Sequence, residues 1–104
     1  MAINSKRKGK TGERELAALL RSYGFEDAKR SQQYCGANGD ADVVDAFPDI
    51  HIECKRVERL NINEAMEQAD KDCGDKMPVV FHRKNRTPWL VTMHLDDFIT
   101  LYKK

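Results

Sequence analysis

The segment from Ile50 to Lys55 most constrains the fold, because its side chains alternate between apolar and polar. Successive side chains of a β-strand point to opposite faces, so this alternation predicts a strand. The strand would have two faces, an apolar one formed by Ile50, Ile52 and Cys54 and a polar one formed by His51, Glu53 and Lys55. His51 stands at the start of the strand, so we expect it to face solvent, with an accessory role beside Glu53 as the alternative.

A second strand-like segment, residues 41–46, precedes this strand, and the Phe-Pro-Asp run at 47–49 is typical of a hairpin turn. A turn centred on residues 47–48 places Asp42 opposite Glu53, whereas a turn centred on residues 48–49 places Asp42 opposite Lys55. In either register these three side chains share one face, within about 5–8 Å of one another. Both registers stay open at this point.

Apolar spacing along the rest of the chain predicts three helices and three further strands. The helices are expected over 11–23, from 61 to a stop at Gly74, and over 95–102, and the further strands over 28–34, 78–82 and 89–93. Asn61 and Glu64 resemble a capping box at the start of the second helix. The order α-β-β-β-α-β-β-α predicts an α/β fold (α+β, with a mixed sheet) flanked by helices. Residues 1–9 are expected to be a basic flexible arm, followed by a single domain over 10–104.

The formal net charge of +1 hides a separation of charge along the chain. Residues 31–54 contain five acids and no Lys or Arg, whereas residues 1–30 contain eight basic and four acidic residues. An acidic centre framed by basic segments can hold a cation in the middle and phosphates around it. An ordinary charged surface would account for the same pattern.

Asp42 and Glu53 would repel each other as neighbours on paired strands. A raised pKa, a cationic side chain or a bound metal ion would relieve that repulsion. Oxygen ligands favour Mg²⁺ or Mn²⁺ over zinc, and Lys55 could pair with the carboxylates or hold a water beside the metal. The alternative is a surface ladder of salt bridges worth at most ~1 kcal/mol.

Glu13 could bring a further acid to this place. At ~100° per residue, it lies about 70° from the centre of the apolar face of the first helix, beside Gly9 and Gly12. It could therefore reach towards the sheet. The alternative is that it only stabilises the positive end of the helix dipole.

The cysteines and the hydropathy bear on location. Three widely spaced cysteines and no apolar run of ~18 residues predict a reduced, intracellular, cytoplasmic protein that has no zinc site and does not enter membranes.

Two motifs resemble those of known nucleases. The run from Lys8 to Leu16, continuing to Gly24-Phe25, resembles the opening helix of Holliday junction resolvases of the archaeal and phage type. The pattern Asp42…Glu53-Cys-Lys55 resembles the PD-(D/E)xK signature of the restriction-endonuclease-like superfamily. The resemblance spans residues 8–93 and implies a restriction-endonuclease-like core, in a protein that a phage could encode. The helix at 95–104 has no counterpart in it.

The resemblance implies a role for each matching residue. Asp42 and Glu53 would bind one or two Mg²⁺ (or Mn²⁺) ions, with contributions from Glu13 and from the backbone carbonyl of Cys54. Lys55 would position the attacking water. Gln68 matches an accessory polar residue of the second helix. Because the literal Pro-Asp is missing, Asp40 could replace Asp42 as the ligand; we prefer Asp42, since it leads into the apolar pair at 43–44.

The implied activity is metal-dependent endonucleolytic cleavage of branched DNA, in recombination or repair, by a homodimer. Phosphate contacts are expected from Lys6, Arg7, Lys8, Lys10, Arg30, Ser31, Arg56, Arg59, Arg83, Lys84 and Arg86. Two alternatives stay open: a non-catalytic nucleic-acid-binding module, and a PD-(D/E)xK nuclease acting on flap, fork or duplex DNA.

Overall fold

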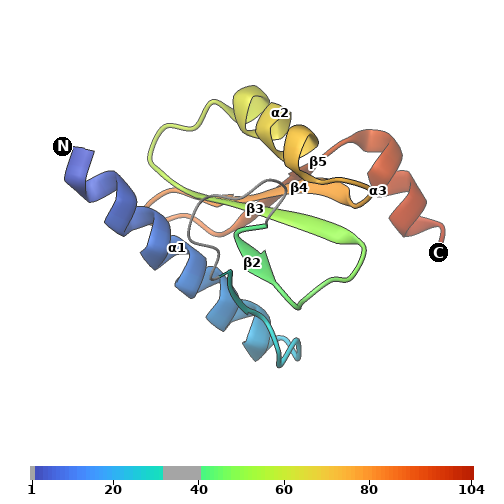
Figure 1. The fold of residues 1–104 in the computed structure, drawn as a ribbon, viewed down its shortest axis with the longest axis horizontal. Coiled ribbons are helices and arrows are strands. Elements are labelled where there is room, and N and C mark those ends of the chain that lie inside the picture. Colours follow the sequence, from blue (N-terminus) through green and yellow to red (C-terminus); the bar gives the residue numbers. More distant parts are fainter. Residues whose placement is uncertain (1, 32–40) are drawn as a thin grey trace.

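The computed structural model describes residues 2–31 and 41–104, with only the backbone described for residues 2–8. Its elements follow the predicted order (Figure 1). They are α1 (Ala2–Ser22), β1 (Lys29–Arg30), β2 (Val43–Val44), β3 (Ile50–Arg56), α2 (Ile62–Asp72), β4 (Met77–Arg83), β5 (Leu90–Met93) and α3 (Leu95–Tyr102).

The strands within these residues form one sheet in the order β1-β2-β3-β4-β5. The pair β3 and β4 is parallel, and α2 connects the two strands, whereas the other neighbouring pairs are antiparallel. This mixed sheet flanked by helices confirms the predicted fold class, including the restriction-endonuclease-like core.

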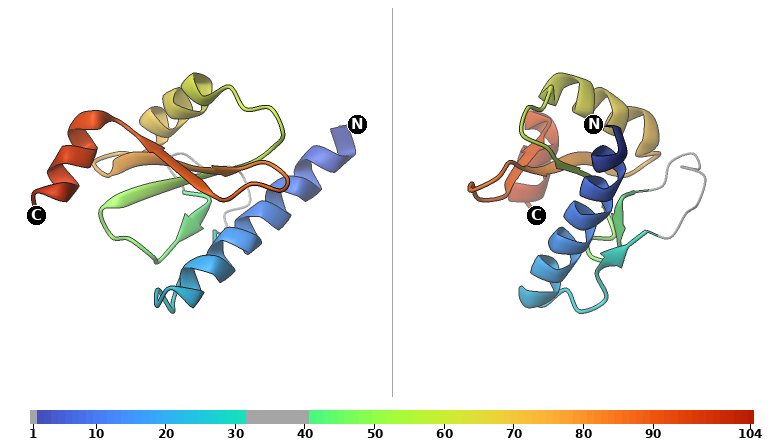
Figure 2. Two further views of the ribbon diagram at one scale, coloured as in Figure 1. Left: turned by 180° about the vertical axis from the view of Figure 1, so that it is seen from behind. Right: turned by 90° about the vertical axis from the view of Figure 1, so that its left-hand side faces the viewer.

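Helices α1 and α2 cover opposite faces of the sheet (Figures 1 and 2). On the α1 face, Leu16 and Leu20 pack with Ile52 of β3. On the α2 face, Met66 and its neighbouring alanines pack on Val80 of β4. Both faces of β3 are therefore covered by protein, although its sequence alternates like that of a half-exposed strand.

Helix α1 differs from its prediction at both ends. It begins at Ala2 rather than near residue 11, so it takes in most of the segment predicted to be a flexible arm. Whether that segment is mobile stays a prediction. At the other end, the helix was expected to run to residue 23, but Tyr23 lies beyond the last helical residue and is exposed. Gly24 follows with φ of 104°, a conformation that glycine adopts readily and that ends the helix.

The Asn61 cap predicted for α2 is present, although the return bond to Glu64 comes from the Asn61 side-chain amide rather than from its backbone N–H. The Glu64 backbone N–H donates to Asn61 Oδ1 at 3.1 Å, and Asn61 Nδ2 donates to Glu64 Oε2 at 3.3 Å. These bonds fix the start of α2 just beyond the end of β3. Among the described residues, no helix is long and apolar enough to cross a membrane.

Candidate active site

The hairpin between β2 and β3 settles the register that brings two acids together. Val43 pairs with Ile52, and the Asp42 backbone N–H donates to the Ile52 carbonyl at 2.9 Å. This is the register of a turn centred on residues 47–48, in which Asp42 faces Glu53 rather than Lys55. Of the two registers that the sequence allowed, this one sets the carboxylates closest together.

The Asp42 side chain is fixed by the backbone of β3. Its Oδ2 accepts a hydrogen bond from the Cys54 N–H at 2.8 Å. Within this edge of β3, the Ile52 carbonyl still pairs with the β2 segment, whereas the next donor, the Cys54 N–H, is taken by the carboxylate. The Asp42 side chain thus adds one hydrogen bond to the pairing of β2 with β3, just before the first residue of β2.

The environment of Asp42 disfavours its negative charge. Burial is the largest cause, followed by the Glu53 carboxylate, and together they raise the pKa of Asp42 to about 7 from an ordinary value of 3.8. The Cys54 hydrogen bond and the Lys55 charge act in the opposite direction. A cation placed between the two carboxylates would favour the ionised form.

Lys55 lies between an acid and an amide. Its Nζ is 3.8 Å from Glu53 Oε2 and donates to Gln68 Oε1 at 3.4 Å. Gln68 comes from α2, so the helix that covers this face of the sheet also holds the end of the lysine side chain. The structure therefore brings Lys55 and Gln68 together with Asp42 and Glu53.

Glu13 reaches the same region from the opposite helix. It accepts a hydrogen bond from Arg30 Nε at 2.7 Å, and its charge contributes to the raised pKa of Asp42. Its position depends on Gly12, because a Cβ at Gly12 would overlap the Cβ of Arg56 on β3. Only glycine allows α1 to approach the strand this closely.

His51 is the residue that we misjudged from the sequence. We expected it to face solvent, but it is fully buried beneath α2, and its Nε2 lies 3.3 Å from Glu53 Oε1. The alternation of the strand could have predicted this burial, because it places His51 on the same face as Glu53, and α2 covers that face.

Some expected residues lie outside what the structure describes. Asp40 falls in residues 32–40, and the side chains of Lys6, Arg7 and Lys8 are not described. Cys54 is described: its thiol is buried on the α1 face, and burial raises its pKa. Only its backbone is therefore suited to a role in the site.

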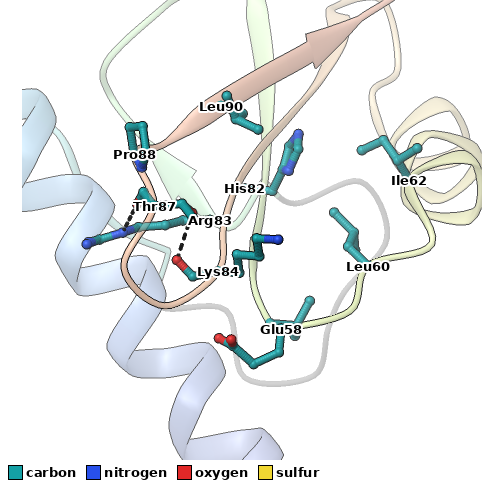
Figure 3. Close-up of a pocket in the computed structure, with 10 residues that line it drawn as sticks. Glu58, Leu60, Ile62, His82, Arg83, Lys84, Thr87, Pro88 and Leu90 are labelled. Atoms are coloured by element: carbon teal, nitrogen blue, oxygen red, sulfur yellow. Dashed lines mark hydrogen bonds between the residues drawn. The ribbon is translucent and has the colours of Figure 1, made fainter.

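Three of the expected phosphate contacts are engaged within the protein, Arg30 by Glu13 and the other two by Glu15. Arg56 Nε donates to Glu15 Oε1 at 3.0 Å, and Arg83 donates from one terminal nitrogen to Glu15 Oε2. Arg83 Nε also donates to the Thr87 carbonyl at 2.6 Å, inside the β4–β5 connection (Figure 3). The two arginines held by Glu15 join α1, β3 and β4 to one another.

Other expected contacts are placed at the surface. Lys10, Arg59, Lys84 and Arg86 are exposed, and the Ser31 backbone N–H donates to the Asp42 carbonyl at 2.9 Å. Arg59 lines an open hollow of about 320 Å³ next to Lys55, together with Asn61 and Gln68. Lys84 lines a more apolar hollow of about 390 Å³ between β5 and the start of α2, shown in Figure 3.

The donor set suits a metal ion that retains water ligands. Within the part of the chain that the structure describes, no three His, Cys, Asp or Glu side chains are grouped to hold a metal. Two carboxylates and a backbone carbonyl remain available, and Mg²⁺ commonly binds through one or two carboxylates while keeping several waters. Burial and then the Glu53 charge raise the pKa of Asp42, and such an ion would offset the negative charge of the two carboxylates.

The fold is a restriction-endonuclease-like core, and Asp42, Glu53 and Lys55 follow one another in the order of the PD-(D/E)xK pattern. The model of the family described as "Phage putative PDDEXK endonuclease" matches residues 4–104, which includes α3. The chain belongs to this family. Searches of curated proteins and of solved structures each found no match.

Proposed function

We propose that this chain is a Mg²⁺- or Mn²⁺-dependent endonuclease that hydrolyses phosphodiester bonds of DNA. The observation that carries the proposal is the pairing of Asp42 with Glu53 across the β2–β3 hairpin, with the Lys55 ammonium 3.8 Å from Glu53 Oε2. Burial and then the neighbouring Glu53 carboxylate raise the pKa of Asp42 to about 7, and carboxylates perturbed in this way are concentrated at functional sites.

Each residue has a defined task in this proposal. Asp42, Glu53 and the Cys54 carbonyl hold the cation, and Glu13 adds negative charge from α1. The bound cation supplies Lewis-acid chemistry: it lowers the pKa of a water and stabilises charge on the phosphate. Lys55, steadied by Glu53 and Gln68, orients the attacking water and donates to the negative charge that develops.

DNA approach is assigned to the side where Lys55 meets the hollow lined by Arg59 and Asn61. Exposed Lys10, Lys84 and Arg86 supply phosphate contacts, which position the backbone without reading its sequence. Arg56 and Arg83 contribute mainly by fixing α1 to the sheet, because Glu15 already occupies them.

Branched DNA is the proposed substrate, and a homodimer is the proposed assembly. Both follow from the resemblance of the first helix to junction resolvases. A resolvase must cut two strands in a symmetric way, and a two-fold dimer supplies two sites related by that symmetry.

A panel of substrates tests this proposal. The full chain is incubated with four-way junction, fork, flap, duplex and single-stranded DNA, in Mg²⁺ or in EDTA. We expect Mg²⁺-dependent cleavage, strongest on the four-way junction. Cleavage that persists in EDTA would refute the metal-dependent mechanism. Faster cleavage of a flap or of plain duplex would reject the branched-junction assignment. DNA binding without any cleavage would instead identify a non-catalytic binding module.

A further inference from the structure

Helix α3 carries an apolar stripe that the described part of its own chain leaves exposed. Leu95, Phe98, Ile99 and Tyr102 recur at i, i+3, i+4 and i+7, the spacing with which a helix normally faces its own core. No residue of α3 is buried, and Leu95 and Tyr102 are 74% and 79% exposed. The stripe therefore faces solvent in the single chain.

Polar contacts at both ends hold α3 in this orientation. His94 Nε2, at the residue that caps the helix, lies 2.9 Å from Asp70 Oδ1 of α2. Lys104 Nζ, just beyond the helix, donates to Asp49 Oδ2 at 2.6 Å. Figures 1 and 2 show α3 at the end of the molecule opposite the start of α1.

The charges beside the stripe are self-complementary. Asp96 and Lys103 are exposed and seven residues apart. At ~100° per residue they lie within about 20° of each other around the helix, on the same side of the stripe. When two copies of α3 lie antiparallel, Asp96 of each copy comes beside Lys103 of the other. Pairing with a second copy thus creates two attractive contacts and no like-charge contact on this flank.

The exposed area is of the size that a dimer needs. Taking ~150–250 Å² for a large side chain, the four stripe residues expose on the order of 500 Å² per copy. Two copies would together bury on the order of 1,000 Å², the lower bound expected of a specific interface.

We propose that α3 of one chain packs antiparallel against α3 of a second copy, forming a two-fold homodimer. The homodimer is part of the proposed function, and this inference locates its interface. The interface leaves the candidate active site open. The end of α3 is held near Asp49 by the Lys104 contact, and Asp49 lies about 13 Å from Glu53 along the strand direction.

The test measures mass rather than cleavage, so its outcome is independent of nuclease activity. Light scattering after size exclusion should give the full chain a mass of twice 12.0 kDa. Phe98→Glu should raise the dimer dissociation constant on the order of 100-fold, because it places a charge in the stripe. Circular dichroism should show its secondary structure unchanged.

Tyr23→Glu is the matched control, because Tyr23 is likewise an exposed aromatic residue but lies just beyond the end of α1. It should remain dimeric. A monomeric wild-type chain would overturn the proposal. So would a dimer that Phe98→Glu leaves intact.

Mixing two variants tests the antiparallel arrangement directly. Asp96→Lys and Lys103→Asp should each dissociate, since each then sets like charges together in the homodimer. Mixed in equal amounts, they should form a heterodimer, because opposite charges meet again on both sides. No gain in dimer on mixing would reject the antiparallel pairing.

Discussion

The Asp42 carboxylate accepts a hydrogen bond from the Cys54 backbone N–H at 2.8 Å, in the place where a backbone carbonyl of a paired strand would accept it. The bond fixes one carboxylate oxygen on the sheet, opposite Glu53. Burial and the charge of Glu53 both oppose the ionisation of Asp42. Holding both acids ionised in this site therefore costs electrostatic free energy. That cost makes the site sensitive to pH and to cations.

The pKa of Asp42, raised to about 7, predicts a pH-dependent stability. The folded chain keeps a proton that the unfolded chain releases near pH 4, so unfolding releases a proton between these values. The contribution of this group to the free energy of unfolding is therefore complete below about pH 4 and declines as pH rises to about 7. Asp42→Asn should flatten this part of a urea-denaturation series measured against pH.

The same group predicts how Mg²⁺ affects stability. Cation binding requires the ionised carboxylate, so MgCl₂ should raise the melting temperature more at pH 8 than at pH 6. Asp42→Asn should reduce the shift at pH 8. Equal shifts at both pH values, or a shift unchanged in Asp42→Asn, would contradict the assignment of Asp42 as a ligand.

Gly12 and Gly9 provide a matched pair in α1. A Cβ at Gly12 would overlap Arg56 Cβ, whereas at Gly9 it would meet nothing within 4 Å. Gly12→Ala should therefore lower the free energy of unfolding by about 1–3 kcal/mol as α1 moves off the sheet. Gly9→Ala should raise it by about 0.5–1 kcal/mol through helix propensity. Urea denaturation compares the two, and equal effects would argue against the close approach.

His51 should act as a positioning residue for Glu53. His51→Phe fills the buried space but removes the contact at 3.3 Å, so cleavage should fall about 10–100-fold, as for residues that orient metal ligands. His51→Gln, which can still donate, should recover part of the rate. A structural role alone predicts lost stability in both variants, with no rescue. The measurement is the rate at saturating DNA, compared with the melting temperature of each variant.

Much of the fold follows from local patterns in the sequence. Alternation defined β3, the capping box at Asn61 defined the start of α2, and the spacing of apolar residues gave α3 its bounds. The extension of α1 back to Ala2 was not predicted, because residues 2–10 lack the apolar periodicity used to recognise a helix. Strand length was also overestimated at β2, where only Val43–Val44 pair regularly.

The features of the site that could not be predicted from the sequence depend on contacts between residues far apart in the chain. Two hairpin registers were compatible with the residues, and only the observed pairing of Val43 with Ile52 chooses between them. The burial of His51 depends on α2 crossing above β3. Likewise, Glu15 binds Arg56, which is 41 positions away in the sequence, and Arg83, which is 68 positions away. In the sequence, the positive charge of these two arginines could not be distinguished from that of the exposed lysines, so all of them were expected to contact phosphates.

Glu53→Gln tests whether the paired acids cut DNA, and Glu67→Gln is its control. Both substitutions remove one carboxylate without changing side-chain size, but Glu67 is exposed on α2, away from the paired acids. With a labelled four-way junction in Mg²⁺, Glu53→Gln should cut at least about 1,000-fold more slowly while still binding the DNA, and Glu67→Gln should cut at the wild-type rate. Wild-type cleavage by Glu53→Gln would contradict the account.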